Sequence, residues 1–152
     1  MQFANSYNLS VVVPCYNEEE TLSVFYKEVL KHIYSFMETG KLKGYEFVFV
    51  DDGSTDATAS LLQDFACRDD NVRYLILSRN FGKEAAIFAG LQKTTGTYVV
   101  IMDADSQDPP ALIPQMLEVV SCGEFDCAAT RRVTRKGEPP IRSFFARKKA
   151  AA

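Results

Sequence analysis

Several features by which common enzyme classes are recognised are missing from this sequence. It has one histidine and four cysteines in 152 residues, and no two cysteines form a C-x-x-C pair, which argues against a zinc site with His and Cys ligands. The dinucleotide fingerprint, the Walker A motif and the G-x-S-x-G elbow are absent, so the corresponding sites are excluded. No apolar run approaches the roughly 20 residues of a transmembrane helix.

The composition that remains is typical of one soluble globular domain. Hydrophobic residues make up 47% of the chain and charged residues 24%, which are ordinary values for a folded domain of this length. The sequence has no recognisable secretory leader, and the cysteines are expected to be reduced thiols of a cytosolic chain. His32 lies inside a helical pattern, where a structural role is favoured over catalysis.

The overall net charge of −3 is divided between two unlike segments. Residues 1–130 carry 9 basic and 19 acidic side chains, a net charge of −10, whereas residues 131–152 carry 8 basic and 1 acidic, a net charge of +7. We therefore expect a core at 1–130 and a basic segment at 131–152 that is flexible or amphipathic. In the basic segment, Ile141, Phe144 and Phe145 alternate with arginines and lysines, a pattern suited to an anionic membrane surface.

Short apolar runs alternate with helical patterns along the core. The runs that predict strands are 9–13, 45–50, 72–77, 97–102 and 125–129. The segments that predict helices are 22–36, 57–67, 83–93 and 111–121. The first run is continuously apolar, which is typical of a parallel strand buried on both faces. Strand–helix alternation at this spacing predicts an α/β fold with a mainly parallel sheet flanked by helices.

The loops that follow the strands form the candidate site, because ligands of such sheets bind beyond the carboxyl ends of the strands. These loops are 14–20, 51–56, 78–83 and 103–110. In the last one, Asp103 and Asp105 directly follow a strand and can turn toward one point. Their oxygens suit Mg²⁺ or Mn²⁺, which binds one or two carboxylates together with substrate phosphates, and Gln107 could add a carbonyl oxygen.

The adjacent Asp51 and Asp52 have two interpretations. Turn and helix-cap chemistry explains Gly53, Ser54 and Asp56, but it does not require two neighbouring carboxylates. Alternatively, one of the two carboxylates accepts hydrogen bonds from a base or a ribose hydroxyl. The sequence leaves both interpretations open.

Two further loops have groups suited to a nucleotide. Tyr16 and Asn17 could place a ring and an amide against a base, and Arg79 and Lys83 could meet phosphate charge near the start of a helix. Either basic side chain taken alone is better explained as a solvated charge.

Together these loops resemble family 2 glycosyltransferases of the GT-A fold, in particular the polyprenyl-phosphate sugar transferases of the bactoprenol glucosyltransferase and dolichyl-phosphate mannose synthase type. The similar segments are VVVPCYNEEE at 11–20, VDDGSTDAT at 50–58, SRNFGKEAAIFAGL at 78–91 and DADSQDPP at 103–110. They follow the family's order and span almost all of residues 9–130. The resemblance implies a Rossmann-like GT-A core that is truncated on its C-terminal side, since family members continue beyond this length.

The resemblance implies a nucleoside-diphosphate sugar as donor and Mg²⁺ or Mn²⁺ as cofactor. The residues expected to bind the donor are Pro14, Tyr16, Asn17, Glu18, Asp51, Asp52, Arg79, Lys83 and Ala104. The metal is expected on Asp103, Asp105 and Gln107. Asp103 and Asp105 are also expected to act in catalysis together with Arg131, which matches a basic position that faces phosphate.

The resemblance further implies transfer with inversion to a polyprenyl phosphate at the cytoplasmic face of the cell membrane, with UDP-glucose as the first expectation for the donor. A phosphate monoester has a second pKa of about 6, so this acceptor would be largely dianionic at pH 7 and would need no general base. Metal and Lys or Arg would stabilise the departing diphosphate. The alternatives are a polysaccharide acceptor and a non-catalytic nucleotide-sugar-binding module. No nucleic-acid partner is expected, and homo-oligomerisation is left open.

Overall fold

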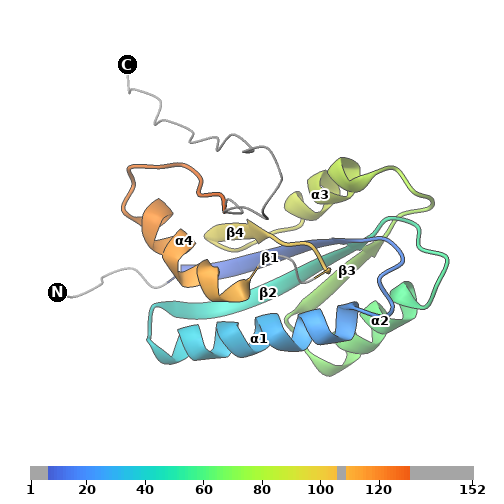
Figure 1. Ribbon diagram of the computed structural model, residues 1–152, viewed down its shortest axis with the longest axis horizontal. Coiled ribbons are helices and arrows are strands. Elements are labelled where there is room, and N and C mark those ends of the chain that lie inside the picture. The colour runs from blue at the N-terminus through green and yellow to red at the C-terminus, as the bar shows by residue number, and fades with distance from the viewer. Residues whose placement is uncertain (1–6, 106–108, 131–152) are drawn as a thin grey trace, which may run out of the picture. The chain divides into compact units, whose positions relative to one another are not determined.

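In the described part of the chain, four parallel strands form a sheet in the order β3-β2-β1-β4 (Figure 1). The computed structural model describes residues 7–105 and 109–130. The chain runs outward from β1 (Tyr7–Cys15) to β2 (Leu42–Asp51) and β3 (Val72–Ile76), and then returns to place β4 (Tyr98–Ile101) on the other side of β1. Open α/β sheets bind ligands where the strand order reverses in this way. The predicted parallel α/β fold is confirmed.

Helices connect the strands and lie on both faces of the sheet. α1 (Leu22–Glu38) and α2 (Thr58–Arg68) lie on one face, and α3 (Lys83–Leu91) lies on the other (Figure 1). α1 buries a row of apolar side chains: Leu22, Phe25, Val29, Ile33 and Phe36. Burying such a side chain contributes roughly 1.5–3 kcal/mol, so the amphipathic spacing of this helix explains its place in the fold.

α3 packs closely on the sheet because its contact position is a glycine. A Cβ atom at Gly90 would come within 2.6 Å of Val12 Cγ1 and 3.1 Å of Val50 Cγ2. Both valines are completely buried in the two central strands. This close packing fixes the position of α3, whose first residue belongs to the candidate site.

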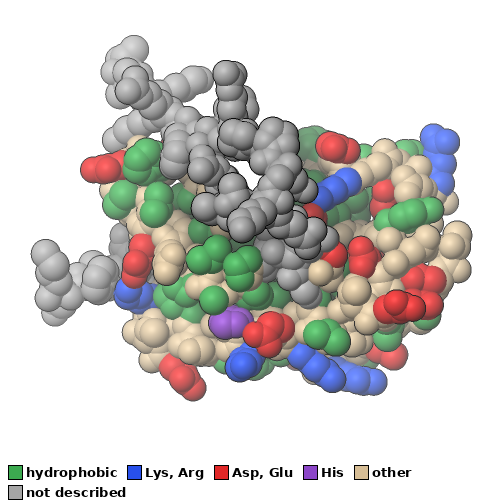
Figure 2. Space-filling model, viewed as in Figure 1, with side chains coloured by type: hydrophobic (Ala, Val, Ile, Leu, Met, Phe, Trp, Pro, Cys, Tyr) green, Lys and Arg blue, Asp and Glu red, His purple; other side chains and the backbone are tan. Residues whose placement is uncertain are grey.

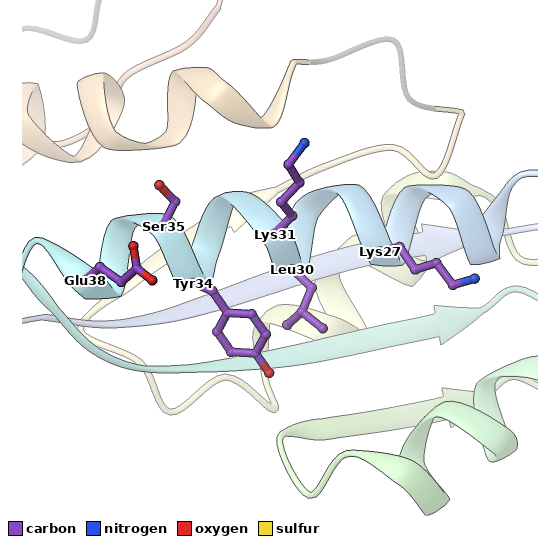
Figure 3. A pocket seen from close by; sticks show the side chains of 6 residues that line it. All are labelled: Lys27, Leu30, Lys31, Tyr34, Ser35 and Glu38. Atoms are coloured by element: carbon purple, nitrogen blue, oxygen red, sulfur yellow. The ribbon is translucent and has the colours of Figure 1, made fainter.

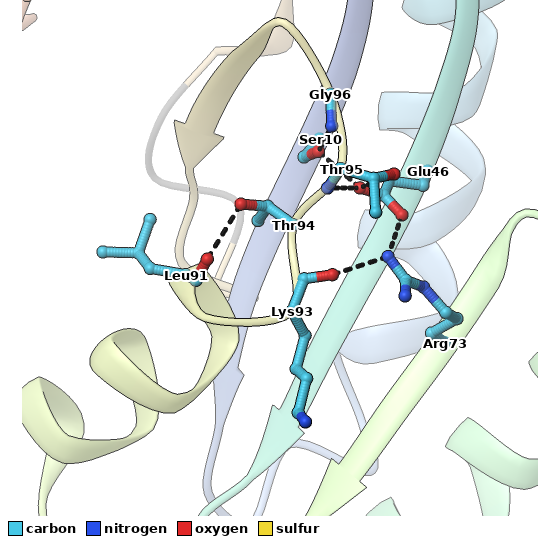
Figure 4. A network of polar contacts seen from close by, with 8 residues as sticks. All are labelled: Ser10, Glu46, Arg73, Leu91, Lys93, Thr94, Thr95 and Gly96. Carbon is cyan, nitrogen blue, oxygen red and sulfur yellow. Dashed lines mark hydrogen bonds and ion pairs between the residues drawn. The ribbon is translucent and has the colours of Figure 1, made fainter.

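Glu46 of β2 ties together the amino edge of the sheet (Figure 4). Its Oε1 accepts hydrogen bonds from Ser10 Oγ of β1 at 2.5 Å and from Thr95 N at 2.6 Å, and its Oε2 pairs with Arg73 of β3. Arg73 also donates to the Lys93 carbonyl oxygen at 2.6 Å. Burial alone would raise the pKa of Glu46, but these donors outweigh burial and lower the pKa below its ordinary value. The connection from α3 to β4 is thereby held at the edge opposite to the candidate site.

The described chain divides into two compact units between Pro110 and Ala111. A short 3₁₀ turn, η1 (Pro110–Leu112), crosses the division, and the second unit contains α4 (Ile113–Ser121). The prediction of a strand at 125–129 is wrong, because these residues are irregular and line, together with α4, an apolar pocket of about 290 Å³. An apolar run forms a strand only where a neighbouring strand offers hydrogen-bond partners. None of the helices among the described residues has the length and apolarity needed to cross a membrane.

Candidate functional site

The loops that follow the strands meet at the carboxyl edge of the sheet in the first unit. β1 and β2 end level with each other, since Cys15 pairs with Asp51, and Asp52 N donates to the Cys15 carbonyl oxygen at 2.8 Å. Beyond the end of β4, Met102 N donates to the Val12 carbonyl oxygen at 3.0 Å. The chain therefore enters the loops after β1, β2 and β4 from neighbouring points.

The loops after β1 and β2 are joined by side chain–backbone hydrogen bonds. Asn17 N donates to Ser54 Oγ at 2.9 Å, and Thr55 N donates to Asn17 Oδ1 at 2.8 Å. Glu18 N donates to Thr58 Oγ1 at 2.9 Å. Asn17 has a φ of 54°, a left-handed conformation that asparagine tolerates better than most residues. The predicted site residues Asn17 and Glu18 are thus fixed against the loop that contains Asp51 and Asp52.

The carboxylates of Glu19 and Asp56 each accept a backbone hydrogen bond from the other of the same two loops. Glu19 N donates to Asp56 Oδ2 at 3.1 Å, and Ala57 N donates to Glu19 Oε2 at 2.8 Å. Thr58 N donates to Asp56 Oδ1 at 2.9 Å. Burial alone would raise the pKa of Asp56, but the hydrogen bonds from Thr58 and Glu19 together outweigh burial and lower the pKa of this carboxyl. Asp56 thus accepts a hydrogen bond from the first residue of α2, as the helix-cap interpretation predicted, but the N-cap residue of α2 is Ala57, which makes no side-chain cap hydrogen bond.

Asp51 and Asp52 are both buried, with 1% and 3% of their surface exposed, and they serve different loops. Asp51 Oδ1 accepts hydrogen bonds from the backbone amide and the hydroxyl of Ser54. Asp52 accepts from Phe81 N at 2.7 Å and from Gly82 N at 2.9 Å, the amides that lead into α3. Both carboxylates therefore organise loops, and a contact of either one with a nucleoside stays a prediction.

Gly53 brings the loops after β2 and β3 into backbone contact. Its φ is +72°, and a Cβ atom there would lie 2.4 Å from the Arg79 carbonyl carbon. Only glycine satisfies both the left-handed conformation and the close approach. The turn interpretation of Gly53 is confirmed, and it explains how Arg79 comes close to the loop that contains Asp51 and Asp52.

Two basic side chains lie on the loop after β3 and at the start of α3. The Arg79 guanidinium lies over the Phe81 ring, 4.7 Å from its centre, as in a cation–π contact. Lys83 Nζ lies 2.6 Å from Asp103 Oδ2, with side-chain exposures of 54% and 37%. The structure thus joins Lys83, predicted to meet phosphate, to Asp103, predicted to hold the metal.

The candidate metal ligands after β4 are two acidic side chains on either side of a buried alanine. Ala104 is 1% exposed, whereas Asp103 is partly exposed and Asp105 is exposed. Across residues 7–105 and 109–130, no group of three or more His, Cys, Asp or Glu side chains could hold a metal ion. Two accessible carboxylates nevertheless fit Mg²⁺ or Mn²⁺, because these ions complete their coordination with water and substrate phosphate.

Of the remaining predicted site residues, some lie at the carboxyl edge and others fall outside the described part of the chain. Tyr16 is 46% exposed at the carboxyl edge, and Pro14 is partly buried within β1. Gln107 and Arg131 lie outside the described residues. His32, the only histidine (purple in Figure 2), pairs with Glu28 on the surface of α1 at 3.0 Å. This pairing within α1 is compatible with the structural role that the sequence favours for His32.

Cys15, the cysteine at the end of β1, adds no nucleophile to this site. All four are free thiols, and Cys15, at the end of β1, is the buried one. Burial above all, with smaller contributions from Glu18 and Asp51, raises the pKa of the Cys15 thiol. A neutral buried thiol is chemically inert.

A groove of about 410 Å³ lies on α1 rather than at the loops (Figure 3). Its described lining is Lys27, Leu30, Lys31, Tyr34, Ser35 and Glu38. These side chains lie on one helix surface, and none of them is a predicted site residue. The geometry of the loops, not this groove, therefore defines the candidate site.

The cross-loop partners Glu19 and Thr58 were missing from the predicted site. Each makes its contact with a residue about forty positions away, so no local spacing indicates the pairing. The only local signal was the presence of capping residue types before α2. Such a signal marks a helix start but does not identify the second loop that it holds.

Comparisons with known proteins show which family the chain is similar to. The family model described as glycosyl transferase family 2 matches residues 10–145. A bactoprenol glucosyl transferase of Shigella phage SfX is 46% identical over 117 residues, which are 76% of this chain and 36% of that protein. An undecaprenyl-phosphate 4-deoxy-4-formamido-L-arabinose transferase of Pseudomonas fluorescens is 41% identical over 129 residues, 84% of this chain and 36% of that protein. The chain thus spans about a third of the length of these relatives.

Solved glycosyltransferase structures share the fold. A mannosyltransferase from Pyrobaculum calidifontis, in complex with GDP-Man and Mn²⁺, matches with a TM-score of 0.57 and 28% identity, over 67% of this chain and 28% of that one. Residues 1–349 of TarS from S. aureus, in complex with UDP, match with a TM-score of 0.51 and 29% identity, over 64% and 27%. Because the family model matches most of the chain and the solved structures share its fold, the chain belongs to glycosyl transferase family 2 and has the GT-A type of α/β fold.

Proposed function

We propose that this chain provides the donor-binding part of an inverting, metal-dependent glycosyltransferase. The enzyme moves a sugar from a nucleoside-diphosphate sugar, with UDP-glucose as the first candidate, to a polyprenyl phosphate at the cytoplasmic face of the membrane. The observation that supports this most is the grouping of Asn17, Asp52, Lys83 and Asp103 in linked loops at the carboxyl edge of the sheet.

Each of these loops has a distinct task in the proposed reaction. The loops joined by Asn17 and Ser54 form the nucleoside side of the site, and Tyr16 is exposed there to stack on a base. Asp103 and Asp105 would hold the divalent cation, which would neutralise the charge that develops on the departing diphosphate. Lys83 and Arg79 contribute positive charge to the same diphosphate.

The acceptor is proposed from the relatives and from the chemistry of the site. Proteins named for transfer to bactoprenol and to undecaprenyl phosphate are 46% and 41% identical to this chain. A lipid phosphate that is largely dianionic at pH 7 attacks without losing a proton. The site residues therefore have to position the reactants and stabilise charge, and no general base is required.

Transfer of radiolabelled glucose from UDP-glucose to undecaprenyl phosphate, assayed with the complete enzyme that contains this chain, tests the proposal directly. Organic extraction separates the lipid product, and GDP-mannose and UDP-N-acetylglucosamine serve as competing donors. Asp105→Ala should lower Mn²⁺-dependent transfer by about 10²–10³-fold, because stabilisation of the leaving group is lost. Asp70→Ala, which changes an exposed aspartate between α2 and β3, is the matched control.

Three results would each overturn part of the proposal. Unchanged transfer by the Asp105→Ala protein would remove the metal role of this residue. Label in a water-soluble polymer, with none in the lipid fraction, would replace the lipid acceptor with a polysaccharide. Binding of the nucleotide sugar without transfer to any acceptor would indicate a non-catalytic binding module.

A further inference from the structure

The ion pair between Lys83 and Asp103 differs from the other carboxylate contacts at this edge. Asp51, Asp52 and Asp56 accept hydrogen bonds from backbone amides, which the fold holds in place. Asp103 Oδ2 is instead paired, at 2.6 Å, with the ammonium group of a lysine. A proposed metal-ligand oxygen is therefore already paired with a cation that belongs to the protein itself.

The two partners differ in how easily they can leave this pair. Asp103 follows β4, where the hydrogen bond from Met102 N to the Val12 carbonyl oxygen anchors the backbone to β1. Lys83 has a flexible four-carbon stem, and its side chain is 54% exposed. Exposed ion pairs are weak, so the ammonium can move to another anion at little cost while the carboxylate stays in place.

We propose that Lys83 competes with the divalent cation for Asp103, and that the donor diphosphate relieves this competition by drawing Lys83 to its own oxygens. This inference rests on the proposed function, since it takes Asp103 as a metal ligand. Lys83 is then a positioning residue for the metal as well as a phosphate contact. As a consequence of this competition, the cation and the nucleoside diphosphate bind cooperatively. This cooperativity adds to that from any direct contact between the two ligands.

Binding of Mn²⁺ to the protein, measured from the EPR signal of the free ion, tests the competition without any turnover. Lys83→Met should bind Mn²⁺ in the absence of nucleotide about two- to five-fold more tightly than the unaltered protein. Saturating UDP should tighten Mn²⁺ binding by a smaller factor in Lys83→Met than in the unaltered protein. Lys83→Arg, which keeps the charge, should restore the weaker binding.

Lys93→Met is the matched control, because Lys93 is an exposed lysine just beyond the other end of α3. Tighter Mn²⁺ binding in Lys83→Met but not in Lys93→Met supports the competition. Equal tightening in both would show only a loss of net positive charge and would overturn it, as would unchanged or weaker binding in Lys83→Met. If Asp103→Asn binds Mn²⁺ as well as the unaltered protein does, the metal assignment in the proposed function fails instead.

Discussion

Asp52 and Gly53 are neighbours in the chain, and both hold the loop after β2 against the loop after β3. Asp52 accepts hydrogen bonds from the Phe81 and Gly82 amides at 2.7 and 2.9 Å. Gly53 allows the Arg79 backbone to approach within the space that any side chain would occupy. A substitution at either position should therefore alter the conformation of the loop that leads to Lys83, although neither residue belongs to that loop.

Replacing Gly53 with alanine should have two energetic costs: a strained left-handed backbone and a steric clash with the Arg79 backbone. Gly53→Ala should destabilise the protein by about 1–2 kcal/mol for the left-handed conformation and by a further amount for the clash with Arg79, which denaturant unfolding would measure. Gly40→Ala is the control, because Gly40 has a φ of +74° with no atom within 4 Å of the added Cβ. Equal losses in the two variants would contradict the close approach at Gly53.

At the scale of helices and strands, apolar patterns predicted the elements of the first unit, including β3 and β4, which are only partly buried. The run at 9–13 lies inside β1 and is entirely buried, and the pattern at 22–36 lies inside α1, which buries its recurring apolar residues. The strand predicted at 125–129 did not form. Its apolar residues meet the composition of a strand, but a strand depends on a distant partner that a local pattern does not contain.

In the candidate site too, the positions of the loops could be predicted from the local sequence, but the contacts between distant residues could not. The position of Asp103 and Asp105 after a strand was predictable, because parallel strands place the loops that follow them at one edge. The contact of Asn17 with Ser54 spans 37 residues, and that of Lys83 with Asp103 spans 20. Such pairs result from sheet order and register, so the sequence indicated the loops but not which side chains meet.

Glu46 connects three strands with the segment that leads into β4, and its carboxylate makes this connection depend on pH. Its pKa is lower in the folded protein than in the unfolded chain, because donors from Ser10, Thr95 and Arg73 outweigh burial. Its contribution to stability is therefore present above the unfolded pKa of about 4.5 and is lost as pH falls through the lower folded pKa.

Glu46→Gln should lower the free energy of unfolding by about 1–2 kcal/mol at neutral pH, since a charged acceptor is lost. The difference between this variant and the unaltered protein should shrink as pH is lowered below 4.5, the ordinary pKa. Urea unfolding across this range measures both. Glu38→Gln, at an exposed position of α1, is the control; an equal pH dependence in the two variants would exclude Glu46 as the source.

At the scale of the whole molecule, the charge is separated along the chain rather than balanced locally. Residues 1–130 have a net charge of −10, and many of their carboxylates lie at the loops of the first unit, where acidic side chains are visible in Figure 2. A divalent cation offsets part of this charge in the proposed function. Residues 131–152, outside the described part of the chain, have a net charge of +7, which suits an anionic lipid surface.

Neutralising the basic segment should therefore weaken binding to anionic vesicles. Each basic residue near such a surface contributes about 1 kcal/mol, so replacing Arg142, Arg147, Lys148 and Lys149 with glutamine should reduce co-sedimentation with phosphatidylglycerol-containing vesicles by at least about tenfold. Binding of the unaltered protein should also fall with added salt. The control replaces Lys27, Lys31, Lys41 and Lys43 of the core. Because both variants lose the same charge, equal weakening would assign the effect to net charge, and unchanged binding in the first variant would exclude the segment as a membrane contact.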